Sequence, residues 1–126
     1  MRLQRLVTIL LLASTACLTA PSREVALQIS AIDLPATVSP DSVLRLRIKA
    51  LAGGCRFFDR FEVTRNLVDV DVRAVGIDRG RPDHACTDDI RVHEGTYVLL
   101  PPYGDSVIVR GRQPDGSAMV RVVRVQ

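Results

Sequence analysis

Apolar and charged residues alternate strictly through Leu44-Arg45-Leu46-Arg47-Ile48-Lys49-Ala50. Because successive side chains of a β-strand point to opposite faces, this stretch predicts a strand with one face in the core and the other in solvent. A weaker alternation that begins at Val25 predicts another half-buried strand. After Ala20 there is no helical periodicity longer than two turns. The mature domain is therefore expected to be all-β.

Turn signals cut the rest of the chain into short segments. Residues 113–117 read Gln-Pro-Asp-Gly-Ser, which predicts a hairpin turn because Pro presets the backbone and Gly readily takes positive φ. This turn separates strands expected at 106–112 and 118–125. Similar signals recur about every 8 to 12 residues, and about seven short strands at that spacing predict an antiparallel β-sandwich.

A second hairpin is expected about Arg65-Asn66. Pairing about this midpoint places Phe61 opposite Val70 and Val63 opposite Val68 on the core face. The side chains expected to be buried are those of Leu44, Leu46, Ile48, Phe61, Val63, Val68, Val70, Val107, Val109 and Val120. The side chains expected in solvent are those of Arg45, Arg47, Asp69, Asp71 and Arg110.

A disulfide is expected between Cys55 and Cys86. The chain has three cysteines, and Cys17 falls in a predicted targeting segment, so the folded part keeps an even count. Closing a loop of about 30 residues stabilises a fold by roughly 3 to 4 kcal/mol in the chain-entropy model. A thiolate metal site needs more ligands and usually C-x-x-C spacing, which the sequence lacks. The pattern favours a disulfide over a metal site or a catalytic thiol.

The N-terminus has the three-part anatomy of a secretory signal. Arg2 and Arg5 are followed by an apolar run over 6–13 and by small residues up to Cys17. The apolar run is shorter than the about 20 residues that a spanning helix needs. We therefore expect a signal peptide with its signal helix over 1–17, a tether over 18–24 and a β-sandwich domain over 25–126.

The end of this segment, Ala13-Ser14-Thr15-Ala16-Cys17, resembles a bacterial lipobox, although Ser14 stands where that pattern usually has Leu. The resemblance implies that Cys17 receives a lipid, becomes the new N-terminus and holds the protein at a bacterial membrane. Ordinary signal cleavage after Ala16 or Ala20 is the alternative, and it would give a secreted or periplasmic soluble protein.

The mature chain resembles the immunoglobulin-like domains of small exported bacterial lipoproteins. The residues that carry the resemblance are Leu34–Pro40, Gly54-Cys55, Ala85-Cys86-Thr87 and Leu100–Gly104. The resemblance implies a β-sandwich fold and no particular activity. The chain departs from the antibody type because it has no Trp, its cysteines fall in expected loops, and no Tyr is expected at the tyrosine-corner position.

No constellation of residues in the sequence points to a reaction or a cofactor, so a non-enzymatic protein is expected. The two histidines are His84 and His93, and neither has a nucleophile or carboxylate placed beside it by a motif. The alternative is a periplasmic metal carrier that uses His84, His93 and Met119. The acidic residues near Cys86 are Asp83, Asp88 and Asp89, and their spacing matches no regular Ca²⁺ site.

Charge does not indicate a nucleic-acid partner. The formal charge of +3 falls to about +1 when the predicted signal peptide removes Arg2 and Arg5, and the other arginines alternate with aspartates. The stripe of Arg45, Arg47 and Lys49 could meet anionic headgroups or polysaccharide, or simply protect a strand.

The expected function is that of a non-enzymatic exported envelope lipoprotein, a binding or structural module. The membrane is its partner through the N-terminal lipid, and an envelope protein or polysaccharide is a candidate ligand. The expected binding surface is the long loop over 76–89, with Arg79, Arg81 and Asp83, because a rigid scaffold commonly presents recognition residues on loops.

Overall fold

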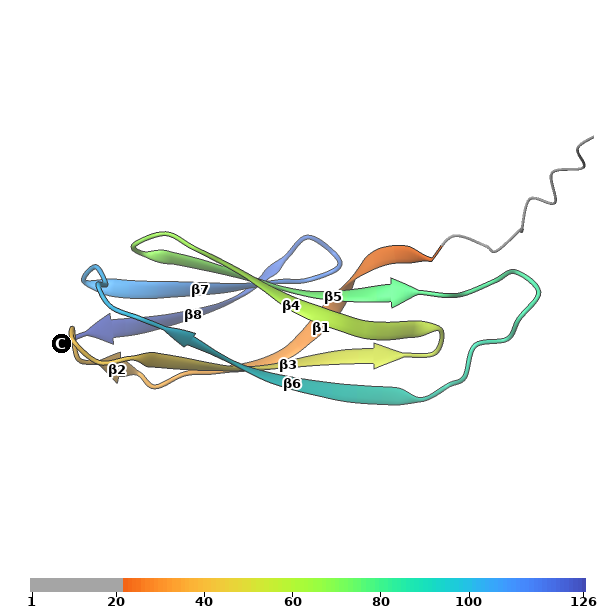
Figure 1. The fold of residues 1–126 in the computed structure, drawn as a ribbon, viewed down its shortest axis with the longest axis horizontal. Coiled ribbons are helices and arrows are strands. Elements are labelled where there is room, and N and C mark those ends of the chain that lie inside the picture. The colour runs from red at the N-terminus through yellow and green to blue at the C-terminus, as the bar shows by residue number, and fades with distance from the viewer. Residues whose placement is uncertain (1–21) are drawn as a thin grey trace, which may run out of the picture.

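A computed structural model of the protein describes residues 22–126, which form an all-β domain of eight strands (Figure 1). The strands are β1 (Arg23–Asp33), β2 (Thr37–Val38), β3 (Leu44–Gly53), β4 (Arg56–Arg65), β5 (Asp69–Asp78), β6 (Ile90–Leu99), β7 (Ser106–Arg112) and β8 (Ala118–Val125). The expected signal peptide, its signal helix, Cys17 and residues 18–21 of the expected tether lie outside the described residues.

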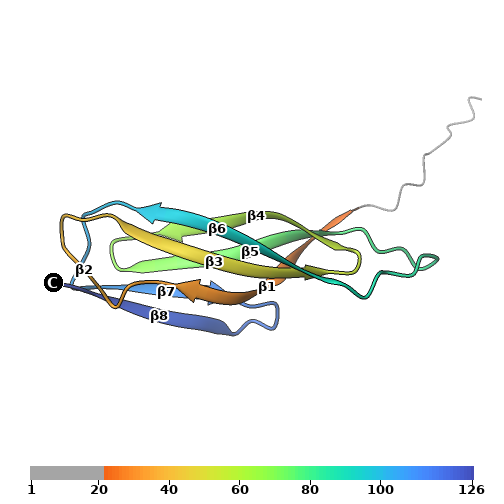
Figure 2. The ribbon, with the colours of Figure 1, turned by 90° about the horizontal axis from the view of Figure 1, so that it is seen from below.

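The strands form one mixed sheet that curls as a half-barrel, in the order β2-β8-β7-β5-β1-β3-β6, with β4 on the other edge of β5 (Figure 2). Strand β1 joins the two parts of the sheet. Its first half pairs with β5 up to Leu27, and its second half pairs with β3 from Gln28 onward. The register of the β1–β3 pairing shifts between Ile29 and Ala31, shortly after this change of partner.

Two of the pairings are parallel, so the expectation of a purely antiparallel sheet was wrong. β5 runs parallel to β7, and the short β2 runs parallel to β8. Both pairings join strands that are far apart in the chain: β6 intervenes between β5 and β7, and β3 to β7 intervene between β2 and β8. Hairpin signals report only the local antiparallel neighbours and carry no information about such returns.

The core lies inside the curl and is built mainly from β-branched residues and leucine. The prediction is confirmed for six side chains, which are buried: Leu44, Leu46, Ile48, Val70, Val107 and Val109. Phe61 and Val63 are half-buried against this core. The prediction was wrong for Val68, which is 36% exposed, and for Val120, which is 47% exposed.

The residues expected in solvent divide into two groups. Arg45 and Arg47 are exposed, as predicted. Asp69, Asp71 and Arg110 are only half-buried, because ion pairs hold them against the sheet: Arg110 pairs with Asp69, and Arg112 lies 2.8 Å from Asp71.

The β4–β5 hairpin has a register four residues away from the predicted one. Phe61 faces Ala74 and Val63 faces Val72. The reason is the turn, in which Asn66 Oδ1 accepts hydrogen bonds from the N–H groups of Val68 at 3.0 Å and Asp69 at 2.8 Å, so that Val68 belongs to the turn and not to a strand. A shift of four keeps the side chains that remain within the two strands, such as those of Phe61, Val63 and Val70, on their predicted faces.

Two predicted element ends are also corrected. β1 begins at Arg23, two residues before the expected start at Val25. β5 continues to Asp78, so the long loop runs over 79–89 and not from Gly76. Gly76 is buried inside β5, where a Cβ would lie 2.7 Å from a Leu27 methyl and 2.8 Å from the Phe57 carbonyl oxygen.

Side chains close the open side of the curl between β4 and β6. The Phe58 ring stacks on His93 with centroids 4.8 Å apart and an interplanar angle of 14°. The Phe61 ring lies directly on the backbone of Gly95, where a Cβ would come within 2.8 Å of two ring carbons. The half-barrel is therefore sealed by aromatic packing at this side.

Two arginines complete the seam between β4 and β6. Arg91 of β6 donates a hydrogen bond to the carbonyl of Arg56 at 2.8 Å. At the other end of β4, Arg65 donates to the carbonyl of Leu100 and, at 2.7 Å, to that of Pro102. The first contact satisfies a carbonyl group of β4, and the second satisfies carbonyl groups of the segment after β6, so both ends of β4 are held to β6 or to the segment that follows it.

Candidate functional site at the disulfide end of the sheet

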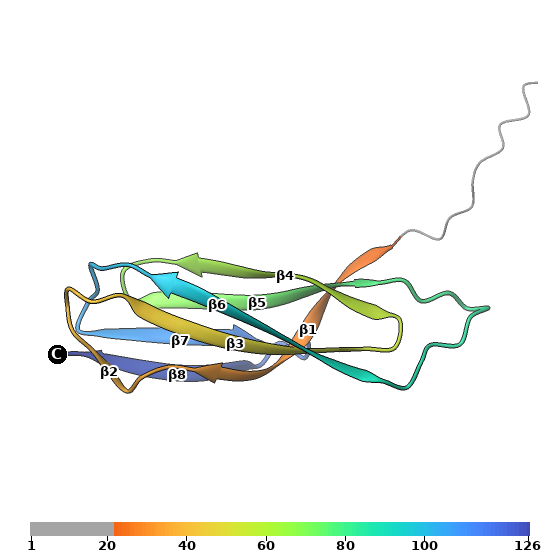
Figure 3. The same cartoon turned by 60° about the horizontal axis from the view of Figure 1, so that its bottom comes forward.

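The Cys55–Cys86 disulfide ties the long loop to the turn between β3 and β4, and it confirms the predicted pairing. The two Cα atoms are 5.2 Å apart. The carbonyl of Cys55 also accepts a hydrogen bond from the Arg79 N–H at 2.9 Å. The loop and the start of β1 lie at the same end of the molecule, opposite the C-terminus (Figure 3). We call this the disulfide end.

The structure does not gather the three predicted binding residues into one group. Arg79 places its guanidinium 5.4 Å from the centre of the Phe57 ring. Arg81 instead lines a depression with Arg23 and Asp78. Asp83 is exposed, as are all residues from Arg79 to Ile90. The loop is therefore accessible along its whole length, but its charged residues face different surroundings.

Asp78 is the electrostatic centre of this end. Its carboxylate accepts a hydrogen bond from the Gly80 N–H at 2.8 Å and lies 3.5 Å from Arg56 and 3.6 Å from Arg23. The Gly80 N–H first, and then the two guanidinium groups, hold the pKa of Asp78 below its usual value. Asp78 therefore stays ionised and fixes the end of β5 to the start of β1 and of β4.

A second carboxylate anchors the other end of the loop. Asp89 accepts a hydrogen bond from the Thr87 hydroxyl and pairs with Arg91. The Thr87 hydroxyl first, and then Arg91, lower the pKa of Asp89. The Arg91 guanidinium also lies 4.8 Å from the centre of the Phe57 ring, so Phe57 contacts two arginines.

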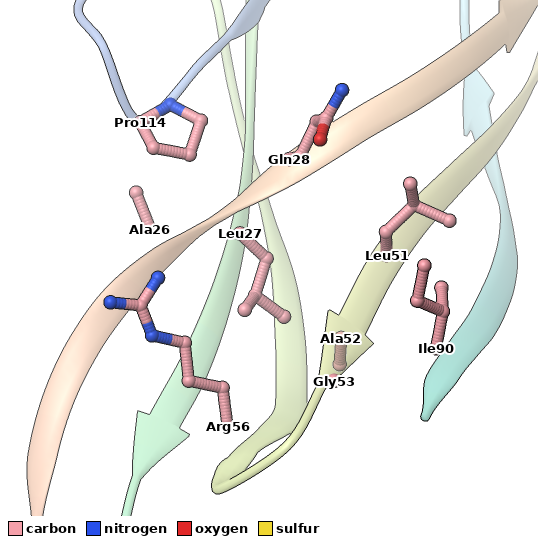
Figure 4. A pocket seen from close by; sticks show the side chains of 9 residues that line it. All are labelled: Ala26, Leu27, Gln28, Leu51, Ala52, Gly53, Arg56, Ile90 and Pro114. Carbon is pink, nitrogen blue, oxygen red and sulfur yellow. The ribbon is translucent and has the colours of Figure 1, made fainter. Parts of the chain in front are cut away.

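A pocket of about 300 Å³ opens where β1 and β3 part (Figure 4). β3 pairs with β1 only up to Leu51, because β1 turns away to pair with β5 from Leu27 back to its start. The pocket, which we call the fork pocket, is lined by Ala26, Leu27, Gln28, Leu51, Ala52, Gly53, Arg56, Ile90 and Pro114. Most of these side chains are apolar, and Arg56 and Gln28 supply its polar groups.

An exposed apolar patch borders the fork pocket on the outer face of β3 and β6. Val92 faces Leu51 and Ile90 faces Gly53 in the β3–β6 pairing, so the three apolar side chains share one face. Ile90 is 74% exposed and Val92 is 61% exposed. We call Leu51, Ile90 and Val92 the proximal patch. Neither the fork pocket nor this patch was predicted from the sequence.

The metal-carrier residues lie on three separate elements. His84 is exposed in the loop, His93 stacks on Phe58 between β6 and β4, and Met119 of β8 faces Gly111 of β7. The Nε2 atom of His93 is buried and has no hydrogen-bond partner. In residues 22–126 no group of three or more His, Cys, Asp or Glu side chains is arranged to hold a metal ion.

The stripe of Arg45, Arg47 and Lys49 lies along the outer face of β3. Arg47 is paired with Glu94 of β6 at 3.1 Å, so part of the stripe is neutralised. A shallow depression beside it is lined by Asp33, Leu34, Pro35, Arg45, Arg47 and Thr96.

No protein-family model, curated protein or solved structure matches the chain. The part of the chain that the structure describes contains no helix long and apolar enough to cross a bilayer.

Proposed function

We propose that the protein is a non-enzymatic lipoprotein of the bacterial cell envelope, anchored by lipid on Cys17, whose β-domain is an immunoglobulin-like binding module. The observation that carries the proposal is the Cys55–Cys86 disulfide. Such bonds persist in oxidising compartments outside the cytoplasm. They therefore agree with a signal peptide over 1–17 that ends in a lipobox-like Cys17.

The immunoglobulin-like assignment is supported by a contact of Tyr103 between β6 and β7. The Tyr103 hydroxyl lies 2.9 Å from the carbonyl oxygen of Leu99, four residues upstream, and 2.7 Å from that of Ser42. A tyrosine that bonds back to the backbone just before strand F is the tyrosine corner of such domains. The segment at 101–105 brings the Tyr103 hydroxyl back to the end of β6, although Asp105 stands where immunoglobulin domains have their second cysteine, two residues after the tyrosine.

The binding role is supported by the disulfide end. Its loop is accessible over 79–89, the disulfide and the Asp78 contacts fix both ends of that loop, and the fork pocket lies beside it. Exposed loops on a rigid scaffold are where recognition residues are commonly found. The envelope ligand is a membrane component, a protein or a polysaccharide.

The test is crosslinking of the protein in its native envelope. A variant with Arg79→Ala, Arg81→Ala and Asp83→Ala is expected to lose the captured component. The matched control carries Arg121→Ala, Arg124→Ala and Asp105→Ala, which also removes two exposed arginines and one exposed aspartate, but outside this loop. Equal capture by the two variants would exclude the loop as the binding surface.

A further inference from the structure

We infer that the disulfide end docks on a phospholipid surface through the proximal patch, so that the outer face of β3 and β6 lies against the bilayer. This inference rests on the proposed function, because it takes Cys17 as the lipidated residue. It goes further by naming the ligand of the disulfide end and the side chains that touch it.

Only a short length of chain lies between Cys17 and the domain. Six residue steps separate Cys17 from Arg23, where β1 begins. Even fully extended, they span at most about 22 Å. The start of β1 pairs with the end of β5 at Asp78, so the loop over 79–89 leaves the sheet beside it. A lipid on Cys17 therefore keeps the disulfide end close to the headgroups.

The disulfide end also exposes apolar side chains. Ile90 and Val92 are 74% and 61% exposed, and they stand on one face with Leu51 beside the fork pocket. Apolar side chains left in water at a membrane-facing edge can enter the headgroup and acyl boundary. The loop that leads to Ile90 also exposes Arg79 and Arg81, whose long stems let their charge reach phosphate groups.

Charge alone does not set this contact, because the same loop also exposes Asp83 and Asp88. We therefore expect the apolar side chains to carry most of the contact and the anionic lipid to add less. A second copy of the chain is the competing occupant of the patch. The tether favours the bilayer, since a lipid on Cys17 places the patch within reach of it at any protein concentration.

The test uses the absence of tryptophan from the sequence. Val92→Trp places a single tryptophan in the patch, and Ile90→Trp is a second reporter there. The matched control is Val122→Trp, since Val122 is 56% exposed on the outer face of β8, which the strand order places at the far side of the sheet from β6. Each lipidated protein, purified from membranes, is reconstituted into vesicles of phosphatidylethanolamine and phosphatidylglycerol that contain brominated phosphatidylcholine.

The expected result is a blue shift and a loss of tryptophan emission for Val92→Trp and Ile90→Trp, with the emission of Val122→Trp unchanged. Lipid on Cys17 without quenching at either patch position would overturn the docking and leave the proposed function standing. A blue shift without quenching would mean that a protein surface covers the patch, and equal quenching at position 122 would mean a different orientation. Either result overturns the inference. Absence of lipid on Cys17 would overturn the proposed function as well.

Discussion

The side-chain amide of Gln113 bonds to both backbone groups of Ile29. Gln113 Nε2 donates to the Ile29 carbonyl at 2.9 Å, and the Ile29 N–H donates to Gln113 Oε1 at 3.0 Å. Ile29 lies where β1 changes partners from β5 to β3. Gln113 therefore takes the place of a neighbouring strand along the open edge of β1, and it ties the end of β7 to the bend on which the curl of the sheet depends.

Gln113→Ala is expected to lower the free energy of unfolding by about 1–3 kcal/mol, because it leaves the N–H and carbonyl of Ile29 without these partners. Urea unfolding measures the change. Gln126→Ala at the exposed C-terminus is the control, and its effect is expected to stay within about 0.5 kcal/mol. Equal stability of the two variants would show that the bend does not depend on this amide.

Gly95→Ala tests the packing that closes β4 on β6. A Cβ on Gly95 would lie 2.8 Å from the Phe61 ring, and this ring cannot move freely because it also packs on Phe58 at 4.8 Å. We expect a loss of about 1–3 kcal/mol in the free energy of unfolding. Phe61→Leu removes the ring that the new Cβ would meet. Gly95→Ala is therefore expected to lower the free energy of unfolding less in the Phe61→Leu protein than in the wild-type protein. Strict additivity in this double-mutant cycle would contradict the contact.

Tyr103→Phe removes the hydroxyl that contacts the carbonyls of Ser42 and Leu99. The expected cost is about 1 kcal/mol in the free energy of unfolding. Tyr97→Phe is the matched control, because its side chain is exposed on β6 and its stability is expected to be unchanged. The immunoglobulin-like interpretation loses its main support if the two variants unfold at the same urea concentration.

Asp78 links stability to pH. Its pKa is lower in the folded protein than in the unfolded chain, so the ionised carboxylate stabilises the fold. This contribution to the free energy of unfolding is complete at pH values above the pKa of the unfolded chain, about 4, and is lost as pH falls through the lower pKa of the folded protein. Asp78→Asn is expected to reduce stability at pH 7 and to flatten its decline on acidification. Urea titrations from pH 7 down to about 2 measure both effects. An unchanged acid profile would mean that Asp78 is not coupled to folding.

The strands that rest on local alternation were predictable. Leu44 to Ala50 gives the correct faces of β3, because a period of two depends only on neighbouring residues. β8 shows the limit of this signal, because valines occupy both of its faces. The sequence therefore does not indicate that Val123 is buried while Val120 and Val122 are exposed. The hairpin register was missed because Asn66 moves the turn through its side chain.

The candidate site was predictable only in part. Two cysteines outside the predicted targeting segment were enough to predict the disulfide, and the exposed loop follows from its composition. The fork pocket could not be predicted, because it forms only where the partner of β1 changes between β3 and β5. The β1–β5 pairing joins residues 23–27 with residues 74–78, and local sequence patterns do not report such a distant pairing. The proximal patch was missed for the same reason, since the outer face of β6 is defined by its pairing with β3.

The most direct test of the account is the intact mass of the mature protein extracted from membranes. We predict a chain that begins at Cys17 and carries a diacylglyceryl group on its sulfur. A chain that begins at Cys17 without added lipid, one that begins at Pro21, or one that keeps Met1 would contradict this prediction.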